Sequence, residues 1–432
     1  MNTLFLELNE FNEPLLREAS AELRLKNVEK LLHFHKSETW TEDLYESDFL
    51  EPWVQWVSIH TGIPSSEHQI KHLGDVPQLK TPQIWEKLSE KGISSGIWGA
   101  MNASRNQTAN CLFFLPDPWT ASETAFPKEL NALLDPLRFI SKNYRPSPAI
   151  IPQVGSLIKL FKRNNLGKCL AKESVLLLKN VLRYKGKPFV LVSFLDYLST
   201  RLFLKYKERY HPNFSLLFLN SIAHLQHHEW KNRKIIPKDP LAHGFKTIDK
   251  ILGHIMNAMK PDDLLIVTNA LSQKNTSDEK PWILYRQIDH QKFLQAVGIP
   301  DARVEAHMTH DAHLFFSSTS SAQTAKRILQ GIQVNGSKLF LVESYPNEPL
   351  KLFYRIQFTD VLPKDAYFEV SEKRLPFFDL FSSIVQRTGK HIQKGTLFCN
   401  KPLFPSRLFN HEIGDTLLQN CHSKEPLRFQ SR

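Results

Sequence analysis

Two short segments, far apart in the chain, carry residue types that bind metal ions. Asn220 and His224 lie four positions apart directly after the apolar run FSLLFL, and His391 follows Gly389 near the other end of the chain. Two imidazoles and one oxygen donor approach the composition of an open catalytic zinc site. The alternative is a cleft without metal, in which the same groups only form hydrogen bonds.

Further histidines cluster in the runs HLQHHEW and HMTHDAH. In the first run, His224 and His228 are four positions apart and would share one face of a helix. An ordinary hydrogen-bonded pair is the competing interpretation for His228. In the second run, His310 could act as a general acid or base or contact substrate, and histidines on the surface of a small domain are the alternative.

The segment EPWVQW, predicted to be part of a loop over residues 50–61, combines a carboxylate, an amide and two indoles. Trp53 and Trp56 could stack on a sugar or a nucleobase while Gln55 binds its edge, and packing of the indoles in the core is the alternative. Asn102, after the apolar run ISSGIWGA, is a further candidate for substrate binding.

The elements that must position these residues alternate between apolar strands and amphipathic helices. Strands are predicted at residues 4–8, 93–100, 188–196, 214–221 and 262–270, and helices at residues 14–32, 82–92 and 246–259. Such alternation is typical of an α/β fold whose mostly parallel central sheet is covered by helices on both faces. Ligands of such sheets bind at the carboxyl ends of the strands.

The pattern of apolar and polar residues changes between residues 298 and 378. A helical pattern at residues 320–332 is followed by two alternating strand patterns, KLFLVES and LKLFYRIQF. We interpret this segment as a small α+β cap inserted into a main domain that covers residues 1–297 and resumes over residues 379–432.

Composition sets the outer limits. The chain has 432 residues, of which 41% are hydrophobic, and its four cysteines show no CxxC spacing. This length and hydrophobic content are enough for one large domain with an insertion. The cysteine spacing gives no support for a disulfide framework. The sequence shows no signal-peptide pattern and no long apolar span, so a cytoplasmic location is expected.

The net charge of +11 is concentrated in residues 142–187, which hold eleven Lys or Arg residues and one acid, Glu173. Apolar runs such as SVLLLKNVL alternate with these charges and predict amphipathic helices. Their basic faces could meet anionic lipid headgroups, with peripheral membrane contact, or an anionic glycan. A solvated helix face is the alternative. Nucleic-acid binding is the least favoured reading, and it would show a steep dependence on salt.

In order and spacing, these motifs resemble the alkaline phosphatase superfamily, which includes phosphatases, phosphodiesterases and sulfatases. Asn220 and His224 match the Asp-x-x-x-His motif of that family with Asn in place of Asp, and GKH matches its terminal Gly-x-His. Asn9, after the first strand, stands where the family has an acidic ligand. The resemblance therefore implies a metal site built from Asn9, Asn220, His224 and His391.

The chain departs from this family at its charged positions. The segment HTGIPSSEH resembles the family stretch that starts the helix behind the nucleophile, and the nucleophile position falls on Pro52, nine residues before Thr61. Ala270 and Leu271 occupy the slots of an Asp-His pair. The remaining groups that could act in catalysis are these: Glu7, Glu51, Ser58 and Thr61.

Because the positions of three carboxylates are neutral, we expect at most one divalent metal, with zinc favoured. The resemblance implies a hydrolase or transferase that acts on a phosphate- or sulfate-bearing substrate such as a phosphodiester, lipid headgroup or glycan. Direct displacement would require no covalent nucleophile. The alternative is a catalytically degenerate member that binds an anionic glycan, lipid or nucleotide.

Overall fold

The computed structural model of the chain describes residues 2–143, 150–231, 234–307 and 310–421. The chain divides into two compact units. The first contains Met1–Phe139, Pro146–Asn275 and Thr388–Arg432, and the second contains Ile140–Arg145 and Thr276–Arg387. The whole segment 298–378 lies within the second unit.

The first unit is built around an eight-stranded sheet with the strand order β20-β2-β19-β6-β1-β5-β3-β4. Among these strands only β19 runs antiparallel to its neighbours. The bounds of the strands are β1 Thr3–Leu8, β2 His35–Trp40, β3 Ser95–Trp98, β4 Cys111–Leu115, β5 Phe214–Leu219, β6 Leu264–Thr268, β19 Lys394–Cys399 and β20 Arg407–Phe409. The predicted mostly parallel α/β sheet is thereby confirmed.

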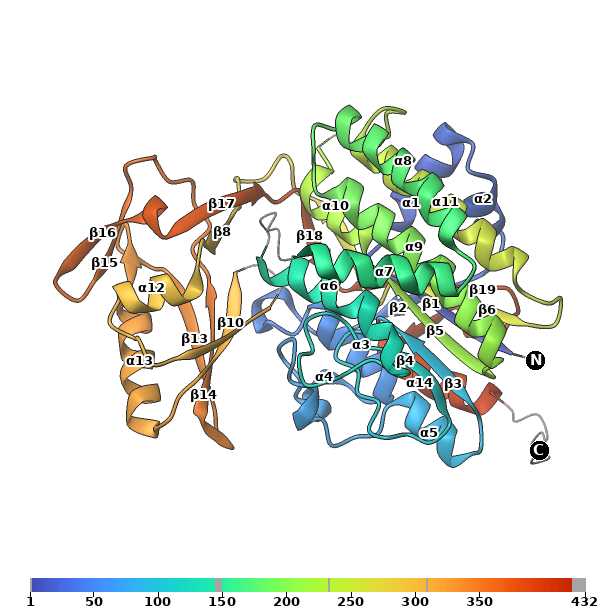
Figure 1. Ribbon diagram of the computed structural model, residues 1–432, viewed down its shortest axis with the longest axis horizontal. Helices are drawn as coiled ribbons and strands as arrows, with labels where there is room; N and C mark the ends of the chain where they lie inside the picture. The colour runs from blue at the N-terminus through green and yellow to red at the C-terminus, as the bar shows by residue number, and fades with distance from the viewer. Residues whose placement is uncertain (1, 144–149, 232–233, 308–309, 422–432) are drawn as a thin grey trace. The chain divides into compact units, whose positions relative to one another are not determined.

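Helices cover both faces of this sheet (Figure 1). Every residue of β1, β5 and β6 is buried, as expected for strands enclosed on both sides. One face carries α1 Glu13–Leu23, α2 Lys26–Leu32, α9 Phe189–Tyr210, α10 Ser221–Glu229 and α11 Pro240–Asn257. The other face carries α3 Pro52–Thr61, α5 Ile84–Glu90 and α14 Asn410–Asn420, with the short α4 Ser65–His68 beside α3.

Two predictions of local structure are wrong. Residues 188–196, predicted as a strand, begin the helix α9, whose buried residues continue at spacings of three and four beyond Asp196 to Tyr206. Residues 50–61, predicted as a loop, form the helix α3. This helix begins at Pro52 and ends where Gly62 adopts φ 76°, so the TG dipeptide closes a helix and does not start one.

The basic segment contains two helices, α7 Ile151–Arg163 and α8 Gly167–Arg183, as predicted. The helix α6, Asn131–Asn143, precedes them, and residues 144–149 lie outside the described part. Within the described residues, no helix combines the length and the apolar character that crossing a membrane requires.

The second unit has its own core and three small sheets. The predicted helix and the two alternating strands of this segment are confirmed as α13, β13 and β14. Its elements are β8 Ile283–Gln287, α12 His290–Ala296, β9 Arg303–Ala306, β10 Asp311–Phe315, α13 Thr319–Gly331, β11 Gln333–Val334, β12 Ser337–Lys338, β13 Phe340–Tyr345, β14 Glu348–Ile356, β15 Tyr367–Val370, β16 Lys373–Pro376 and β17 Phe381–Gln386.

Asp196 of α9 accepts hydrogen bonds from the backbone N–H groups of Asn220 and Ser221, which start α10. Burial raises the pKa of Asp196 to about 6, whereas an unfolded Asp titrates at about 3.9. Between these values the folded chain binds more protons than the unfolded chain. The stability that the protonated carboxyl contributes is therefore present below pH 4 and lost as the pH rises through about 6.

Replacing Asp196 with Asn should remove this pH dependence, because an amide oxygen can accept the same two hydrogen bonds without charge. Relative to the wild type, Asp196→Asn is expected to gain about 2 to 3 kcal/mol in free energy of unfolding between pH 4 and pH 7. Urea denaturation at both pH values measures the difference. If the free energies of unfolding of the two proteins differed by the same amount at pH 4 and at pH 7, the raised pKa of Asp196 would be contradicted.

Candidate functional site

Three neighbouring parallel strands end at one edge of the sheet, and an amide residue follows each of them. The strands β6, β1 and β5 are adjacent, and Asn269, Asn9 and Asn220 follow them in that order. Nδ2 of Asn9 donates to Oδ1 of Asn220 over 2.9 Å. The structure therefore brings these two residues together at the carboxyl end of the sheet.

Glu10, the residue after Asn9, is the acidic group of this edge. Its φ of 57° lies in the left-handed region, which costs a non-glycine residue about 1 kcal/mol. In a regular strand Glu10 and Asn9 would point to opposite faces. Here the turn brings Nδ2 of Asn9 within 2.9 Å of Oε1 of Glu10, so the carboxylate points into the same polar cluster as the asparagines.

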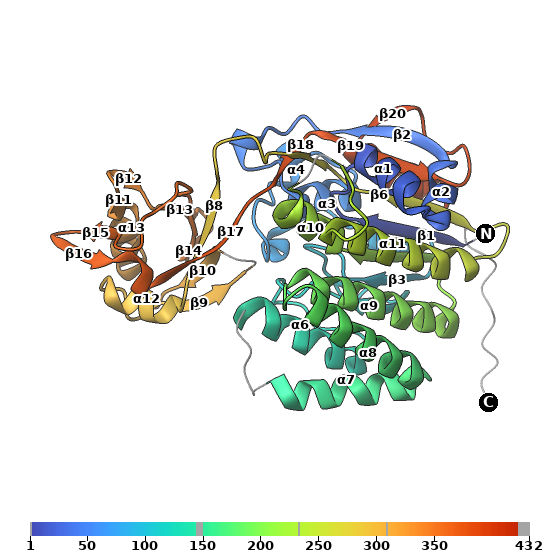
Figure 2. The ribbon, with the colours of Figure 1, turned by 90° about the horizontal axis from the view of Figure 1, so that it is seen from above.

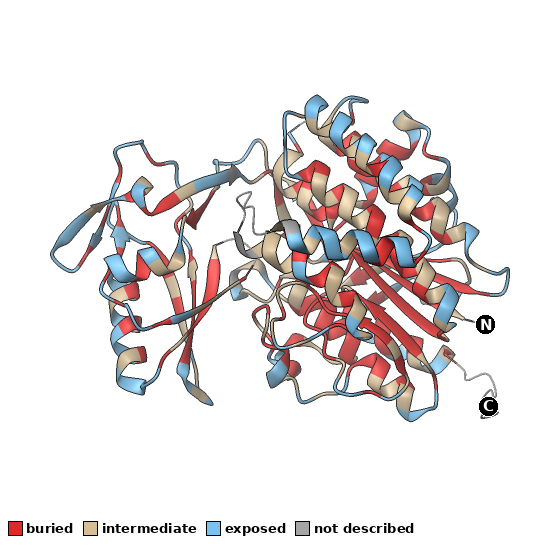
Figure 3. Ribbon diagram, viewed as in Figure 1, coloured by how far each residue is buried: buried red, intermediate tan, exposed pale blue. Residues whose placement is uncertain are grey.

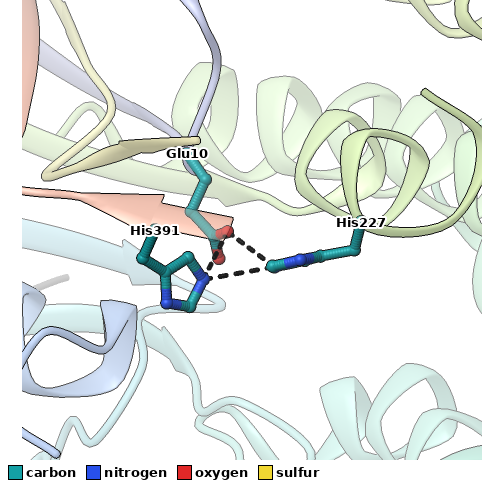
Figure 4. Close-up of side chains that lie close together, drawn as sticks. All are labelled: Glu10, His227 and His391. Atoms are coloured by element: carbon teal, nitrogen blue, oxygen red, sulfur yellow. Dashed lines mark hydrogen bonds and ion pairs between the residues drawn. The ribbon is translucent and has the colours of Figure 1, made fainter. Parts of the chain in front are cut away.

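Glu10, His227 and His391 converge on one point (Figure 4). Oε2 of Glu10 lies 2.9 Å from Nε2 of His227 and 2.9 Å from Nε2 of His391. The two Nε2 atoms are 3.2 Å apart. Glu10 and His391 are buried, and His227 is nearly so, with 13% of its side chain exposed.

The other nitrogen of each imidazole faces a backbone carbonyl. Nδ1 of His227 is 3.1 Å from the oxygen of Gly389, and Nδ1 of His391 is 3.1 Å from the oxygen of Leu50. A carbonyl only accepts, so both Nδ1 atoms must carry hydrogen. In the neutral rings, two Nε2 lone pairs and a carboxylate oxygen then face one another. Three acceptors at this separation require a cation among them, either a proton or a metal ion.

The pKa values of His391 and Glu10 also indicate that a cation is held between these groups. Burial alone would lower the pKa of His391, but the carboxylates of Glu10 and Glu51 raise it to about 10. Burial alone would raise the pKa of Glu10, but the imidazoles of His391 and His227 bring it well below its usual value. Without a metal ion, His391 therefore holds the shared proton.

A tetrahedral zinc ion fits the spacing of the three atoms. With bonds of about 2.0 to 2.1 Å, neighbouring donor atoms of such an ion lie about 3.3 Å apart. The three separations of 2.9, 2.9 and 3.2 Å are within a few tenths of an ångström of that value. Backbone carbonyls that fix the Nδ1–H of both rings are also what metal-bound histidines commonly have.

A short two-stranded ladder and the helix α10 hold the cluster in place. β18, Gly389–Ile392, pairs antiparallel with β7, Ser272–Asn275, so that His391 lies opposite Gln273. Nε2 of Gln273 donates to Oε2 of Glu10 over 2.6 Å. The backbone N–H of Thr388 donates to the carbonyl of His227 over 2.7 Å, which ties α10 to the start of the ladder.

Gly389 is required by close packing in this ladder. A Cβ at this position would lie 2.0 Å from Oε1 of Gln273 and 2.7 Å from the carbonyl oxygen of Gln226. We expect Gly389→Ala to lower the free energy of unfolding by about 1 to 3 kcal/mol through overpacking, and to displace the carbonyl that orients His227. Denaturant unfolding measures the loss.

Gly155→Ala in α7 is the matched control, because nothing lies within 4 Å of a Cβ there. Glycine is a poor helix former, so this change should raise the free energy of unfolding by up to about 1 kcal/mol. Equal effects of the two substitutions would mean that the ladder is not tightly packed.

The structure places the predicted ligands as follows. His391 belongs to the cluster. Asn9 and Asn220 lie beside it, but their amides are bonded to each other, and Oδ1 of Asn9 also accepts from Nε1 of Trp56 over 2.8 Å. His224 lies one turn before His227 in α10. Its ring packs edge-on against His228 at 4.6 Å, and burial, with the nearby His227, lowers its pKa to about 4.

Of the predicted catalytic carboxylates, Glu51 adjoins the cluster and Glu7 does not. Oε2 of Glu51 is 3.2 Å from Nδ1 of His391, and 16% of its side chain is exposed. Glu7 is fully buried and paired with Nε2 of His60 at 2.5 Å. Burial raises the pKa of Glu7, and His60 offsets part of that rise.

The predicted hydroxyl groups belong to α3, and both already form hydrogen bonds. Oγ1 of Thr61 donates to the carbonyl of Val57 over 2.7 Å. Oγ of Ser58 is 3.0 Å from Nε2 of His68. Because Nδ1 of His68 accepts from the backbone N–H of Ile70, its Nε2 carries the hydrogen in the neutral ring and donates to Ser58. This tautomer does not accept a proton from the hydroxyl.

The predicted substrate-binding residues of the first unit are engaged in contacts within it. Trp53 donates from Nε1 to the carbonyl of Lys71, and Gln55 donates to the carbonyl of Phe49. Trp56 is fully buried and donates to Asn9. Asn102 donates to the carbonyls of Trp53 and His72.

His310 belongs to the second unit. Its backbone carbonyl accepts from the N–H of Ile356, and burial, with Arg387 and Arg355, lowers its pKa to about 3.

Sequence reasoning did not select Glu10, His227 or Gln273. HLQHHEW offered three histidines, and helical spacing drew attention to His224 and His228 on one face. The partners that select His227 are Gly389 and Thr388, about 160 residues away, and no local pattern reveals them. The run SQKN after a strand gave no ligand signal at all.

No protein-family model matches the chain. A search of curated proteins also finds no match. Among solved structures, the chain is similar to phosphonoacetate hydrolase from Sinorhizobium meliloti 1021 in complex with phosphonoformate. That similarity has 13% sequence identity and a TM-score of 0.45, and it covers 98% of this chain and 96% of that one.

It is also similar to an inactive murine ectonucleotide pyrophosphatase/phosphodiesterase 5 in complex with AMP. Here the identity is 10% and the TM-score 0.47, with 98% of this chain and 97% of that one covered. The human protein of the same name gives 11% identity and a TM-score of 0.40, with 99% and 97% covered. These proteins are members of the alkaline phosphatase superfamily.

Proposed function

We propose that the chain is a hydrolase of anionic phosphate- or sulfate-bearing substrates and that Glu10, His227 and His391 hold a single divalent metal, with zinc fitting best. The observation that carries this proposal is the convergence of three acceptor atoms within 3.2 Å while both Nδ1 atoms are committed to carbonyls. A carboxylate with two histidines leaves room in a zinc coordination sphere for water or substrate.

A bound metal of this kind would polarise a phosphoryl oxygen and lower the pKa of a bound water. We propose Glu51 as the group that receives a proton. It adjoins His391 and is partly exposed, whereas Glu7 is enclosed and already paired with His60. Pro52 supplies no nucleophilic atom, so a direct attack by water is proposed. The water oxygen would form the new P–O or S–O bond as the bond from phosphorus or sulfur to the ester oxygen breaks, and Glu51 would take the water proton. The departing oxygen would keep the bonding electron pair and take a proton from solvent.

The surrounding residues position the carboxylate that would bind the metal. Asn9 donates to Oε1 of Glu10, and Gln273 donates to Oε2. Gln226 donates from Nε2 to the carbonyl of Glu10 over 2.8 Å. These amides fix the direction of the carboxylate without adding negative charge. The resulting site has a low charge and suits one divalent ion.

The same neutrality favours a second candidate, a protein that binds an anionic glycan, lipid or nucleotide without turning it over. Three neutral residues, Asn9, Asn220 and Asn269, follow the three strands. A single proton on His391 can serve as the cation between the three acceptor atoms, because the pKa of His391 is raised to about 10.

Metal content and turnover distinguish the two candidates. The untagged protein is purified without chelators, analysed for metals, then stripped and titrated with zinc, manganese and magnesium. Turnover of a phosphodiester, a phosphomonoester and a sulfate ester is measured in each state. One metal per chain together with turnover supports the hydrolase. A protein that binds no metal and has no turnover contradicts it and favours the binding role.

A further inference from the structure

The helices α7 and α8 form the outer layer of the first unit. Figure 2 shows them on the far side of α9 from the sheet, and Figure 3 shows how much of α7 is exposed. Helix α8 packs on α9 through residues such as Leu170, Leu177 and Val181, which are partly buried against the core. Its opposite side faces solvent.

The exposed side of α8 carries two parallel stripes. Large apolar residues are exposed there, including Leu182 at 81%, Leu178 at 64% and Val175 at 55%. With Ala171 they recur every three or four residues, which places them in one line along the helix. A second line beside it is basic and exposed, and consists of Lys168, Lys172, Lys179 and Arg183.

The helix α7 also exposes both apolar and basic side chains. Val154 and Ile158 are exposed at 40% and 38%, and Lys159, Lys162 and Arg163 are exposed as well. The two helices contain one acidic residue, Glu173, which is buried and paired with Lys250 at 2.7 Å. Their exposed surface therefore combines apolar side chains with positive charge and contains no carboxylate.

A cavity of about 280 Å³ opens beside this surface, between α8, α9 and α11. Leu176, which is 45% exposed, borders it. Its lining includes three cations, Arg183, Lys246 and Lys250, of which Lys250 is paired with the lining carboxylate of Glu173, and two tyrosines, Tyr184 and Tyr197. Ser193 also lines it. This residue is 1% exposed, and its hydroxyl has no hydrogen-bond partner among the described residues.

We propose that the exposed face of α7 and α8 binds peripherally to an anionic lipid bilayer, with the apolar stripe entering the headgroup region and the cavity receiving one anionic headgroup. Interfacial helices combine these two features, a row of large apolar residues and a rim of Lys and Arg without acids. Solvated helix faces rarely carry Leu and Val in such a line. The proposal is independent of the metal cluster.

The charge of the surface selects the membrane over other occupants. A nucleic acid would engage the lysines and leave the leucines exposed to water. A second copy of the chain would bring the same basic stripe against itself. Of these three partners, only an anionic bilayer would bury the apolar stripe and pair the basic stripe with negative charge at the same time.

The test is co-sedimentation of the full chain with vesicles of phosphatidylcholine alone and with vesicles that contain 30% phosphatidylglycerol. We expect at least about tenfold stronger binding to the anionic vesicles, decreasing with added salt. Leu178→Asp with Leu182→Asp should reduce this binding at least about tenfold, as should Lys172→Glu with Lys179→Glu. Lys30→Glu with Lys80→Glu, exposed lysines outside these helices, should leave it unchanged.

Because Leu178 and Leu182 are mostly exposed, their replacement leaves no cavity, and thermal melting should confirm that the fold is retained. Several outcomes would overturn the proposal. These are a wild type that ignores anionic vesicles, leucine variants that bind them as well as the wild type does, or tighter binding to a DNA fragment with no effect of the leucine changes. A dimer in light scattering that the leucine variants abolish would assign the face to a second copy instead.

Discussion

His227→Ala and His391→Ala are each expected to abolish metal binding. Each removes one of the three proposed ligand atoms, which lie within 3.2 Å of one another. Loss of a hydrogen-bonding partner behind a ligand already weakens metal binding by about 10- to 100-fold, so loss of a ligand should exceed about 100-fold. Isothermal titration with zinc, on protein stripped of metal, measures affinity and stoichiometry together.

His224→Asn separates the two possible ligand sets. His224 is the histidine that the family resemblance selects, and His227 is the one that the structure places against Glu10 and His391. We expect His224→Asn to retain one zinc per chain. His33→Ala, an exposed histidine of the same chain, serves as the control for the substitution itself. Metal loss in His224→Asn with retention in His227→Ala would refute the assignment of the cluster.

Glu51→Gln is expected to lower turnover strongly without changing metal binding. The amide oxygen can still accept from Nδ1 of His391, so metal content should not change. A group that transfers protons contributes about 10² to 10⁴ in rate. We therefore expect kcat to decrease by that factor with KM nearly constant, as measured by initial rates on a phosphodiester.

Two companions make this result interpretable. Glu51→Asp keeps the carboxylate at a shorter reach and should recover part of kcat, which a merely structural role would not predict. Glu67→Gln, an exposed glutamate in the neighbouring α4, should leave kcat as in the wild type. Equal kcat in Glu51→Gln and the wild type would leave the proton transfer without its proposed acceptor.

The sheet could be predicted from the sequence because burial on both faces leaves a plain local signal. LFLEL, FSLLFL and LLIVT are short and apolar, and each is a fully buried strand. The same signal failed for residues 188–196, because a buried helix turn and a buried strand look alike over eight or nine residues. The length of α9, which continues to Tyr210, was the cue that separates them.

The site could be predicted only in part. His391, which the family resemblance names as a ligand, lies in the cluster with Glu10 and His227, and its role as a ligand stays a prediction. Asn9 was selected because the family resemblance places the first-strand ligand at that position. The left-handed φ of Glu10 leaves no signal in the sequence. His227 depends on contacts with Thr388 and Gly389, and such distant pairing has no local trace.

The ladder of β7 and β18 has a consequence for how this molecule can vary. The second unit begins at Thr276, directly after β7, and its long segment ends at Arg387, just before β18. The two strands are thus the stem of a hairpin, and an entire compact unit serves as its loop. Gln273 and His391 face each other in that stem. The loop could therefore be exchanged or shortened among lineages while the stem preserves the register of the residues around Glu10.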